Sequence, residues 1–483
     1  MNKNSTHILG IDIGTSGIRL TVVKRPLTSS TQTTTPNESI VLTLTHSFAP
    51  EVIALTQQSS EIWIAGLKQL LIKLSQQFDL NKVNHIIADA TSSTVLLTDL
   101  SGQPLTPALM YHSHQAQQEA QDLMSAYPQV KKSAAYGTTS SLAKTIWLYK
   151  HYSAQQCYVC HQIDLINQFL GAPIGISDYN NVLKLGYDPI TQTWPEWMLN
   201  ALDHFSPQIM LPKVVAPGEV LSMNVSSELR KMGFRADTSI HAGSTDSIAA
   251  FLASGAHQVG EAVSALGSSL AIKQLSSQPI VQAELGLYSH KFFNAWLVGG
   301  ASNVGGKVIR HYYNYSEMSL LNSCVEHLPH LWQHSLSQPY HPLLERGERF
   351  PVNDATLQAL LPPIPQQPLT SEDVSHLTQL LEHSPTQIQE QLSPHLQQHL
   401  VFYAALCSGT ARVEAQSYQA LQALGAEATQ AIYAVGNGQK NRLWQAARKH
   451  YLNAELKQAH SNEAAYGVTR FIKLQHLPKD SLC

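Results

Sequence analysis

The stretch that decides the fold of this 483-residue chain is residues 8–23, ILGIDIGTSGIRLTVV. It predicts a strand, a tight glycine turn at 14–17 and a second strand. The turn would expose backbone N–H groups and the hydroxyls of Thr15 and Ser16, which suits phosphate oxygens. Asp12 at the entrance of the turn suits a hydrated Mg²⁺, although a plain β-hairpin accounts for the same residues.

Outward from this stretch, strands alternate with helices. Further strands are expected at 85–89, 94–99, 262–274, 295–300 and 431–435, and helices at 61–80, 140–151, 162–170, 247–254, 400–424 and 441–449. The alternation predicts an α/β protein with mixed sheets. Residues 316–396 are rich in His, Gln, Pro and Ser, and we expect loops and short helices there.

The composition limits the class of protein. A length of 483 residues predicts two or three domains, and 43% apolar residues suffice for packed cores. The net charge of −3 argues against nucleic acid as a partner. No run of residues is long and apolar enough for a membrane span, and the N-terminus lacks a signal-peptide pattern. We therefore expect a cytoplasmic protein whose partners are small molecules.

The cysteines are few and odd in number, at positions 157, 160, 324, 407 and 483, so a disulfide framework is not expected. Cys157 and Cys160 form a C-x-x-C pair without a second pair to complete a zinc site. A redox role and two half-buried thiols before a helix are the two interpretations of this pair.

The segment Gly243-Ser244-Thr245-Asp246-Ser247 places an acidic residue at the start of an apolar helix. Asp246 there is either a helix cap or a group that takes the proton of a substrate hydroxyl. A helix N-terminus keeps a carboxylate ionised. Phosphoryl transfer tolerates such a weak base, because the transition state needs an oriented nucleophile more than a strong base.

Two further glycine turns follow strands. Leu266-Gly267-Ser268-Ser269 could hold a transferring phosphoryl group, although a tetrapeptide alone means little. Gly436-Asn437-Gly438, which leads into a helix at Asn441, could supply N–H groups to a nucleotide or be a plain strand-to-helix turn. The segment 261–269 also echoes the opening of the chain, which predicts two related α/β halves with a ligand cleft between them.

The order and spacing of these four clusters resemble those of the FGGY carbohydrate kinases, in the actin/hexokinase/Hsp70-like superfamily. The resemblance covers nearly the full length and includes residues 12–15, 162–170 with Asp164, 177–188, 243–254, 299–303 and 436–441. Within the family the chain looks most like the D-ribulokinases of cyanobacteria and plant plastids, first labelled xylulose kinases. That closer match is carried by residues 90–97, 140–144, 245–261, 288–291 and 346–351.

The resemblance implies two ribonuclease-H-like domains that close on ATP and a sugar. Residues 1–253, joined by a last helix at 464–483, would bind the sugar, and residues 254–463 would bind the nucleotide. Asp246 would be the catalytic base, and Ser92, with Asp246 and Ser247, would bind a ketose. Asp12 would position Mg²⁺ through water. The phosphate and nucleotide contacts would come from Gly14, Thr15, Ser16, Gly267, Ser268, Ser269, Gly300, Gly436, Gly438 and Asn441.

Two features depart from the family pattern. Asn437 interrupts a run that is usually three glycines, and the segment before residue 396 is longer than expected. The small polar residues at 90–94 suit a short ketose but do not separate ribulose from xylulose. The expected activity is ATP-dependent phosphorylation of D-ribulose to D-ribulose 5-phosphate. The alternatives are a kinase of D-xylulose, L-ribulose, erythritol or another polyol, and a non-catalytic switch that binds sugar and nucleotide.

Overall fold

The computed structural model describes residues 5–27, 38–152 and 155–472. Within these limits the chain divides into two compact units. The first contains residues 1–257, 290–294 and 460–483, and the second contains residues 258–289 and 295–459. The expected last helix at 464–483 is described as far as residue 472, as α16 (Ala464–Val468) and the short 3-10 helix η6 (Thr469–Phe471), and the remainder lies outside the described residues.

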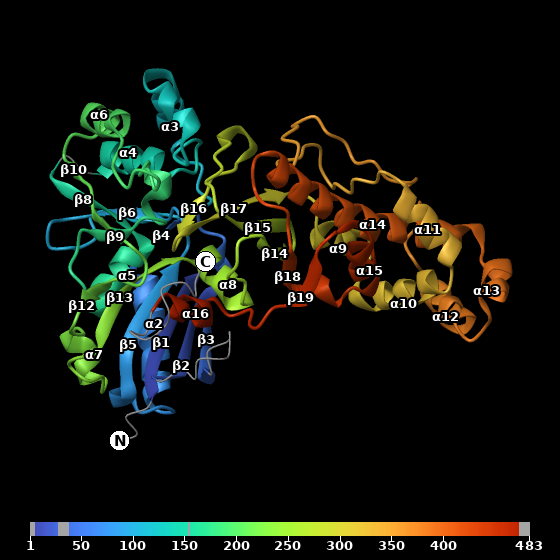
Figure 1. The fold of residues 1–483 in the computed structure, drawn as a ribbon, viewed down its shortest axis with the longest axis horizontal. Helices are drawn as coiled ribbons and strands as arrows, with labels where there is room; N and C mark the ends of the chain where they lie inside the picture. Colours follow the sequence, from blue (N-terminus) through green and yellow to red (C-terminus); the bar gives the residue numbers. More distant parts are fainter. Residues whose placement is uncertain (1–4, 28–37, 153–154, 473–483) are drawn as a thin grey trace. The chain divides into compact units, whose positions relative to one another are not determined.

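The first unit is built on a sheet with the strand order β12-β13-β5-β1-β2-β3 (Figure 1). β1, β5 and β13 run parallel, and β1, β2 and β3 are antiparallel neighbours. The hairpin expected at 8–23 is confirmed, because β1 and β2 pair up to Gly14 and Gly17. The strands are β1 (Ser5–Gly14), β2 (Gly17–Pro26), β3 (Ser39–Ser47), β5 (Val83–Ala90), β12 (Val220–Ser222) and β13 (Ser239–Thr245).

Alternation along β1 decides which helices cover this sheet. Leu9, Ile11 and Ile13 share a buried cluster with residues of α2 (Glu61–Ser75) and α5 (Gln162–Leu170). Gly10 faces the other way, and a Cβ there would clash with the carbonyl oxygen of Ala465 on α16. α16 in turn packs against α8 (Asp246–Ser254). Because side chains alternate along a strand, Asp12 lies on the same face as Gly10, toward α8 and α16.

A second sheet of the first unit has the order β10-β8-β6-β7-β4 and its own buried cluster with α3, α4 and α6. Cys157 and Cys160 both lie on β8 and are fully buried rather than half-buried. The remaining elements of this unit are α1 (Pro50–Ile53), β4 (Gln57–Gln58), η1 (Leu80–Lys82), β6 (Val95–Thr98), β7 (Ala108–Leu109), α3 (Gln117–Ala126), η2 (Pro128–Lys132), α4 (Ser141–Tyr152), β8 (Cys157–His161), β9 (Ile176–Asp178), η3 (Val182–Leu185), α6 (Glu196–Phe205), β10 (Ile209–Met210), β11 (Lys213–Val215), α7 (Ser227–Lys231) and β16 (His290–Phe292).

The second unit repeats the opening motif of the first. β14 (Glu261–Leu266) and β15 (Leu270–Ser276) form an antiparallel hairpin, and β18 (Ala431–Val435) runs parallel to β14, as β5 does to β1. The echo expected from the sequence is thus present in the strand pairing. η4 (Ala283–Leu285) follows β15, and β17 (Ala295–Ser302) and β19 (Glu455–Gln458) extend the sheet on its two sides.

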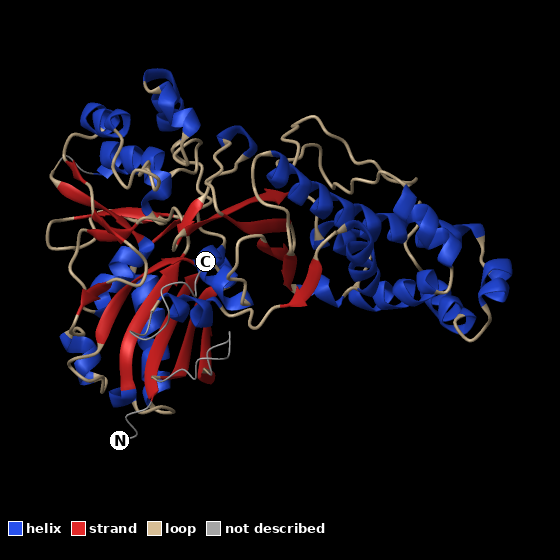
Figure 2. Cartoon of the chain, viewed as in Figure 1, coloured by secondary structure: helices blue, strands red, loops and turns tan. Residues whose placement is uncertain are grey.

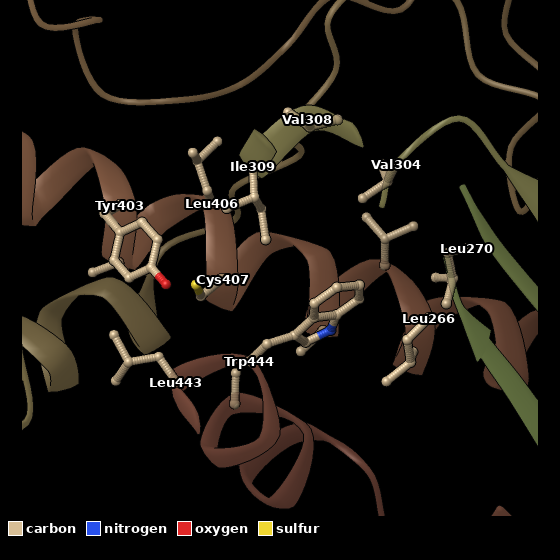
Figure 3. Close-up of a cluster of buried hydrophobic side chains, with 14 of the residues drawn as sticks. Leu266, Leu270, Val304, Val308, Ile309, Tyr403, Leu406, Cys407, Leu443 and Trp444 are labelled. Carbon is tan, nitrogen blue, oxygen red and sulfur yellow. The ribbon is translucent and has the colours of Figure 1, made fainter. Parts of the chain in front are cut away.

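Helices complete the second unit (Figure 2). Figure 3 shows part of their core, where Trp444 and Leu443 lie among Ile309, Leu406 and Leu266 from other elements. The helices are α9 (Gly306–Tyr312), α10 (Tyr315–Glu326), α11 (Pro329–Ser337), α12 (Ser371–Leu380), α13 (Pro385–Gln391), α14 (Pro394–Ala423), η5 (Asn437–Lys440) and α15 (Arg442–Tyr451).

The segment 316–396 holds helices and loops, as expected, but the long helix begins earlier than residue 400. α14 starts at Pro394, and the hydroxyl of Ser393 accepts a hydrogen bond from the backbone N–H of Leu396. Serine at the N-cap followed by proline is a common helix start, because proline lacks the N–H that would be unsatisfied there. None of the helices formed by residues 5–27, 38–152 and 155–472 is both long and apolar enough to cross a membrane.

Candidate functional site

Three carboxyl groups gather where parallel strands of the first unit end. Asp12 near the end of β1 is the register partner of Asp89 near the end of β5. Asp89 is also the register partner of Ser244 on β13, two residues before Asp246. Paired residues of parallel strands present their side chains on the same face of the sheet. The fold therefore brings together Asp12 and Asp246, which the sequence predicted, with Asp89, which it did not single out.

Asp12 is buried and has one cationic partner. Nη1 of Arg19 donates a hydrogen bond of 3.0 Å to Oδ2 of Asp12, and no donor among the described residues reaches Oδ1. Burial raises the pKa of Asp12, whereas the contacts with Asp89 and Arg19 lower it. Asp12 and Arg19 are paired across the β1–β2 hairpin, so the two-residue turn sets this ion pair.

Asp89 is fully buried, and within the part of the chain that the structure describes no N–H or O–H group binds either of its oxygens. Its pKa is raised well above the usual range by burial and by the negative charges of Asp12 and Asp246. A carboxyl group that stays protonated can share its proton with a neighbouring carboxylate. Asp89 is thus suited to be the neutral member of the pair and Asp12 the ionised one.

Asp246 is the first residue of α8, and the N-cap residue is Thr245. The carboxylate accepts a hydrogen bond of 2.6 Å from the adjacent backbone N–H of Ser247. The side chain is half-buried, so part of it is open to a ligand. Its placement at a helix N-terminus confirms the location expected from the sequence, and the helix dipole there favours a negative charge.

Ser92 lies in the turn between β5 and β6, and β5 is the parallel neighbour of the strand that leads into α8. Thr245 is the register partner of Ala90, so residues 91–94 follow β5 beside the start of α8. Thr91, Ser93 and Thr94 are buried in this turn, and Ser92 is half-buried. The turn therefore presents the hydroxyl of Ser92, and Ser247 follows Asp246 directly on α8.

The turn of the first hairpin carries the polar groups that the sequence assigned to phosphate. Gly14 and Thr15 are half-buried, and Ser16 is exposed. The carbonyl oxygen of Ser16 accepts a hydrogen bond from the N–H of Phe48, which fixes the turn and leaves the hydroxyls of Thr15 and Ser16 at the surface of the unit.

The second unit contains a cavity of about 280 Å³. Of the residues predicted for the nucleotide, Gly438 and Asn441 line it. Asn441 is also the N-cap of α15, accepting from the N–H of Trp444 and donating to the hydroxyl of Tyr403. The other lining residues are Gly306, Ile309, Arg310, Tyr315, Met318, Ser319, Asn322, Asn437, Lys440, Arg442 and Trp444.

The turn at 267–269 is joined to this cavity by Arg310. Nη2 of Arg310 donates a hydrogen bond of 2.9 Å to the hydroxyl of Ser268, while its side chain lines the cavity. Ser268 and Ser269 are exposed. Gly436 lies against the backbone of Leu266, and a Cβ at Gly436 would be only 2.9 Å from the carbonyl oxygen of Leu266.

Gly300 lies elsewhere. It is within β17, where a Cβ would meet the ring of Phe350 at 2.7 Å, and it is not among the residues that line the cavity. Sequence reasoning also missed Arg19 and Arg310. Arg19 could have been found by counting back from the hairpin turn, because a two-residue turn at 15–16 pairs residue 12 with residue 19.

A divalent ion is the metal that this family resemblance implies. The described residues contain no group of three or more His, Cys, Asp or Glu placed to hold a metal ion by themselves. Mg²⁺ does not need such a cage, because it keeps several waters and is bound through one or two carboxylates plus substrate phosphates. The buried Oδ1 of Asp12, which lacks a donor among the described residues, fits that kind of site.

Comparison with known proteins supports a family assignment. Residues 7–253, just over half of the chain, match the FGGY family of carbohydrate kinases, N-terminal domain. A gluconokinase of Bacillus licheniformis is 24% identical over 323 residues, which are 63% of this chain and 59% of that protein. The chain thus aligns with about three fifths of the length of this relative.

Solved structures share the fold at low sequence identity. The xylulose kinase of Rhodospirillum rubrum has a TM-score of 0.74 at 18% identity, covering 99% of this chain and 92% of that one. The gluconate kinase of Lactobacillus acidophilus has a TM-score of 0.73 at 16% identity, with coverage of 97% and 89%. Plasmodium falciparum glycerol kinase with ADP has a TM-score of 0.72 at 15% identity, again with coverage of 97% and 89%.

The match across residues 7–253 contains the hairpin of Asp12, the strand of Asp89 and the helix start of Asp246. The α/β fold extends the likeness over nearly the whole chain. This protein belongs to the FGGY family of carbohydrate kinases.

Proposed function

We propose that this protein is an ATP-dependent kinase of a small sugar, with D-ribulose as substrate and D-ribulose 5-phosphate as product. The observation that carries the proposal is the convergence of Asp12 and Asp246 at the ends of parallel strands, with the half-buried Ser92 in the turn that follows the neighbouring strand β5. In-line attack on a phosphoryl group requires an oriented hydroxyl of the substrate and a carboxylate that can accept its proton.

Each residue has a distinct role in this proposal. Ser92 and Ser247 bind hydroxyls of the ketose, and Asp246 orients the terminal hydroxyl and accepts its proton. Thr15, Ser16 and the turn 267–269 contact phosphate oxygens. The cavity lined by Gly438 and Asn441 holds ATP. Mg²⁺ supplies positive charge that stabilises the phosphates, and Asp12 holds it through water.

The ribulose assignment rests on the resemblance of residues 90–97, 140–144, 245–261, 288–291 and 346–351 to the D-ribulokinase branch. The small polar side chains at 91–94 suit a short ketose of either kind. A second candidate is D-xylulose, which is favoured by the fold shared with proteins named xylulose kinases. Sugar kinases separate such substrates by a few hydroxyl contacts, each worth about 1–3 kcal/mol or more where a polar group would be left unsatisfied.

The test is ADP release with Mg²⁺·ATP against D-ribulose, D-xylulose, L-ribulose, D-gluconate, erythritol and glycerol, with Asp246→Asn as the matched variant. Turnover that is highest on D-ribulose and lost in the variant supports the proposal. Turnover highest on another sugar, and lost in the variant, keeps the kinase and replaces the substrate. No turnover on any sugar overturns the kinase assignment and favours a sugar-binding switch.

A further inference from the structure

Lys144 on α4 is a buried lysine that the proposed chemistry does not use. Its side chain is fully buried, and within the described chain no carboxylate pairs with it. An amine taken out of water must find other hydrogen-bond partners inside the protein. The partners of Lys144 therefore indicate which part of the fold this side chain holds.

Nζ of Lys144 donates to three backbone carbonyl oxygens from two loops. The distances are 2.9 Å to Ser93, 2.8 Å to Met110 and 3.1 Å to Tyr111. Burial, together with the charge of Lys184, lowers the pKa of Lys144 to about 6. His112 is the other titratable group that faces it. The neutral amine keeps two N–H donors, so it can still bind two of these three carbonyl oxygens.

The turn that Lys144 holds is strained. Ser93 has a φ of 66°, in the left-handed region that is unfavourable for a residue with a Cβ. Its hydroxyl donates to the carbonyl oxygen of Thr139 at 2.7 Å and accepts from the hydroxyl of Ser141 at 3.1 Å. A strained conformation persists only where its surroundings fix it, and here α4 and the segment before it do so.

The other side of the turn is fixed by a chain of hydrogen bonds. Oε1 of Gln162 accepts from both the N–H and the hydroxyl of Thr91, at 3.1 and 2.6 Å. The hydroxyls of Thr91 and Thr94 are 2.6 Å apart, and the N–H of Tyr111 donates to that of Thr94. Thr91, Ser93 and Thr94 all use their hydroxyls in these bonds, whereas the hydroxyl of Ser92 makes no hydrogen bond within the described residues.

We propose that Lys144 is a positioning residue for the sugar, which clamps the strained turn at Ser93 so that the hydroxyl of Ser92 is held toward the substrate. This inference rests on the proposed function, because it assumes that Ser92 contacts the sugar. Lys144 does not touch the substrate and acts through the backbone of Ser93. A substrate contact is useful only if it is fixed in advance, since a mobile group must be ordered on binding.

The test is a comparison of Lys144→Met with Lys150→Met in the full chain. Lys150 lies on the same helix, is partly exposed and pairs with Glu119 at 3.4 Å, so its loss controls for removing a lysine from α4. Lys144→Met is expected to raise the KM for the sugar about tenfold, the loss of roughly one fixed hydrogen bond, and to leave the KM for ATP within twofold. Lys150→Met is expected to change neither constant.

A binding measurement without catalysis accompanies the kinetics. Sugar alone should raise the Tm of the wild type and of Lys150→Met, and should raise that of Lys144→Met less, while ADP should raise all three equally. Because Lys144→Met strands three carbonyl groups and could fail to fold, Ser93→Ala is the second variant. It removes the hydroxyl bonds of the same turn and is expected to raise the sugar KM by about threefold.

The outcomes separate the two proposals. If the wild type is active and the sugar KM is unchanged in a folded Lys144→Met, the positioning role is overturned and the kinase assignment stays intact. If Lys144→Met does not fold, an unchanged sugar KM in a folded Ser93→Ala has the same meaning. Equal rises in the KM for sugar and for ATP in Lys144→Met also overturn it, because they indicate a general structural role. A wild type that turns over no sugar overturns both.

Discussion

Arg19 and Asp12 face each other across the first hairpin, with Nη1 of the guanidinium donating a 3.0 Å hydrogen bond to Oδ2 of the carboxylate. The carboxylate is almost fully buried, whereas the arginine side chain is 35% exposed. Burial raises the pKa of Asp12, and the positive charge of Arg19 beside it lowers that pKa. This pair therefore bears on the protonation state of Asp12, the residue that we propose holds Mg²⁺ through water.

Replacing Arg19 tests this relationship. Arg19→Gln removes a cation that lowers the pKa of Asp12, so the pKa rises further and ionised Asp12 requires a higher pH. We expect kcat/KM to fall about threefold to tenfold near pH 7 and its acid limb to shift to higher pH, a modest effect because solvent screens Arg19. The pH profile of kcat/KM measures both.

The control for this variant is Glu463→Gln. Glu463 is the second acidic partner of Arg19, 3.7 Å from its Nε, and lies outside the carboxyl cluster. Its loss should leave the acid limb where it is. An unchanged profile in Arg19→Gln would show that Arg19 does not set the ionisation of Asp12.

Asp246→Asn should abolish most of the turnover while the fold stays intact. The amide keeps the shape of the side chain and can still accept from the N–H of Ser247, but it cannot take a proton. We expect kcat to fall by about 10²- to 10⁴-fold, with the sugar KM changing less than fivefold. Steady-state kinetics and thermal unfolding measure this, and a kcat within threefold of the wild type would exclude Asp246 as the base.

Gly438→Ala should weaken nucleotide binding selectively. A Cβ at Gly438 would clash with the ring of Trp444 and lie 2.8 Å from the Cβ of Leu266, so the turn must move away from the wall of the cavity. We expect the unfolding free energy of the protein to fall by about 1–3 kcal/mol and the Kd for ADP to rise about tenfold.

Gln439→Ala, in the same short helix, is the control, because Gln439 is not among the residues that line the cavity. Titration calorimetry with ADP measures both variants. Equal affinities for ADP in Gly438→Ala and the wild type would mean that the cavity is not the nucleotide site.

His85 predicts a pH dependence of stability. Burial, with smaller contributions from His241 and Arg25, lowers its pKa from 6.5 to about 4. Between these two values the unfolded chain binds a proton at His85 that the folded chain does not. The free energy of unfolding therefore falls as pH falls from about 6.5 to 4, by at most about 1.4 kcal/mol per pH unit from this group.

His85→Asn should remove that contribution, because asparagine does not titrate. The substitution is conservative, because the amide can still bond to the hydroxyl of Ser239, the partner of His85 at 2.7 Å. Urea unfolding at pH 4.5, 5.5 and 6.5 measures the difference between variant and wild type. A wild type that loses no more stability than the variant over this range would contradict the buried, neutral state of His85.

Much of the fold followed from local sequence. The glycine turn at 14–17 predicted the first hairpin, and the helix at 162–170 was predicted with the bounds that the structure gives. The start of α14 was placed six residues too late, although Ser393 and Pro394 are a recognisable helix start. Local signals of this kind depend only on backbone preferences and on the spacing of apolar residues.

The sequence by itself determined the elements, the repeated hairpin and the family resemblance, and it singled out Asp12, Ser92 and Asp246. Only the tertiary structure decided that Asp89 completes the carboxyl cluster and that Lys144 clamps the turn of Ser92. The reason is physical. Strand register and the carbonyl groups that a buried lysine binds are non-local, since they join segments separated by 51 residues or more in the cases of Ser93 with Lys144 and Asp12 with Asp89.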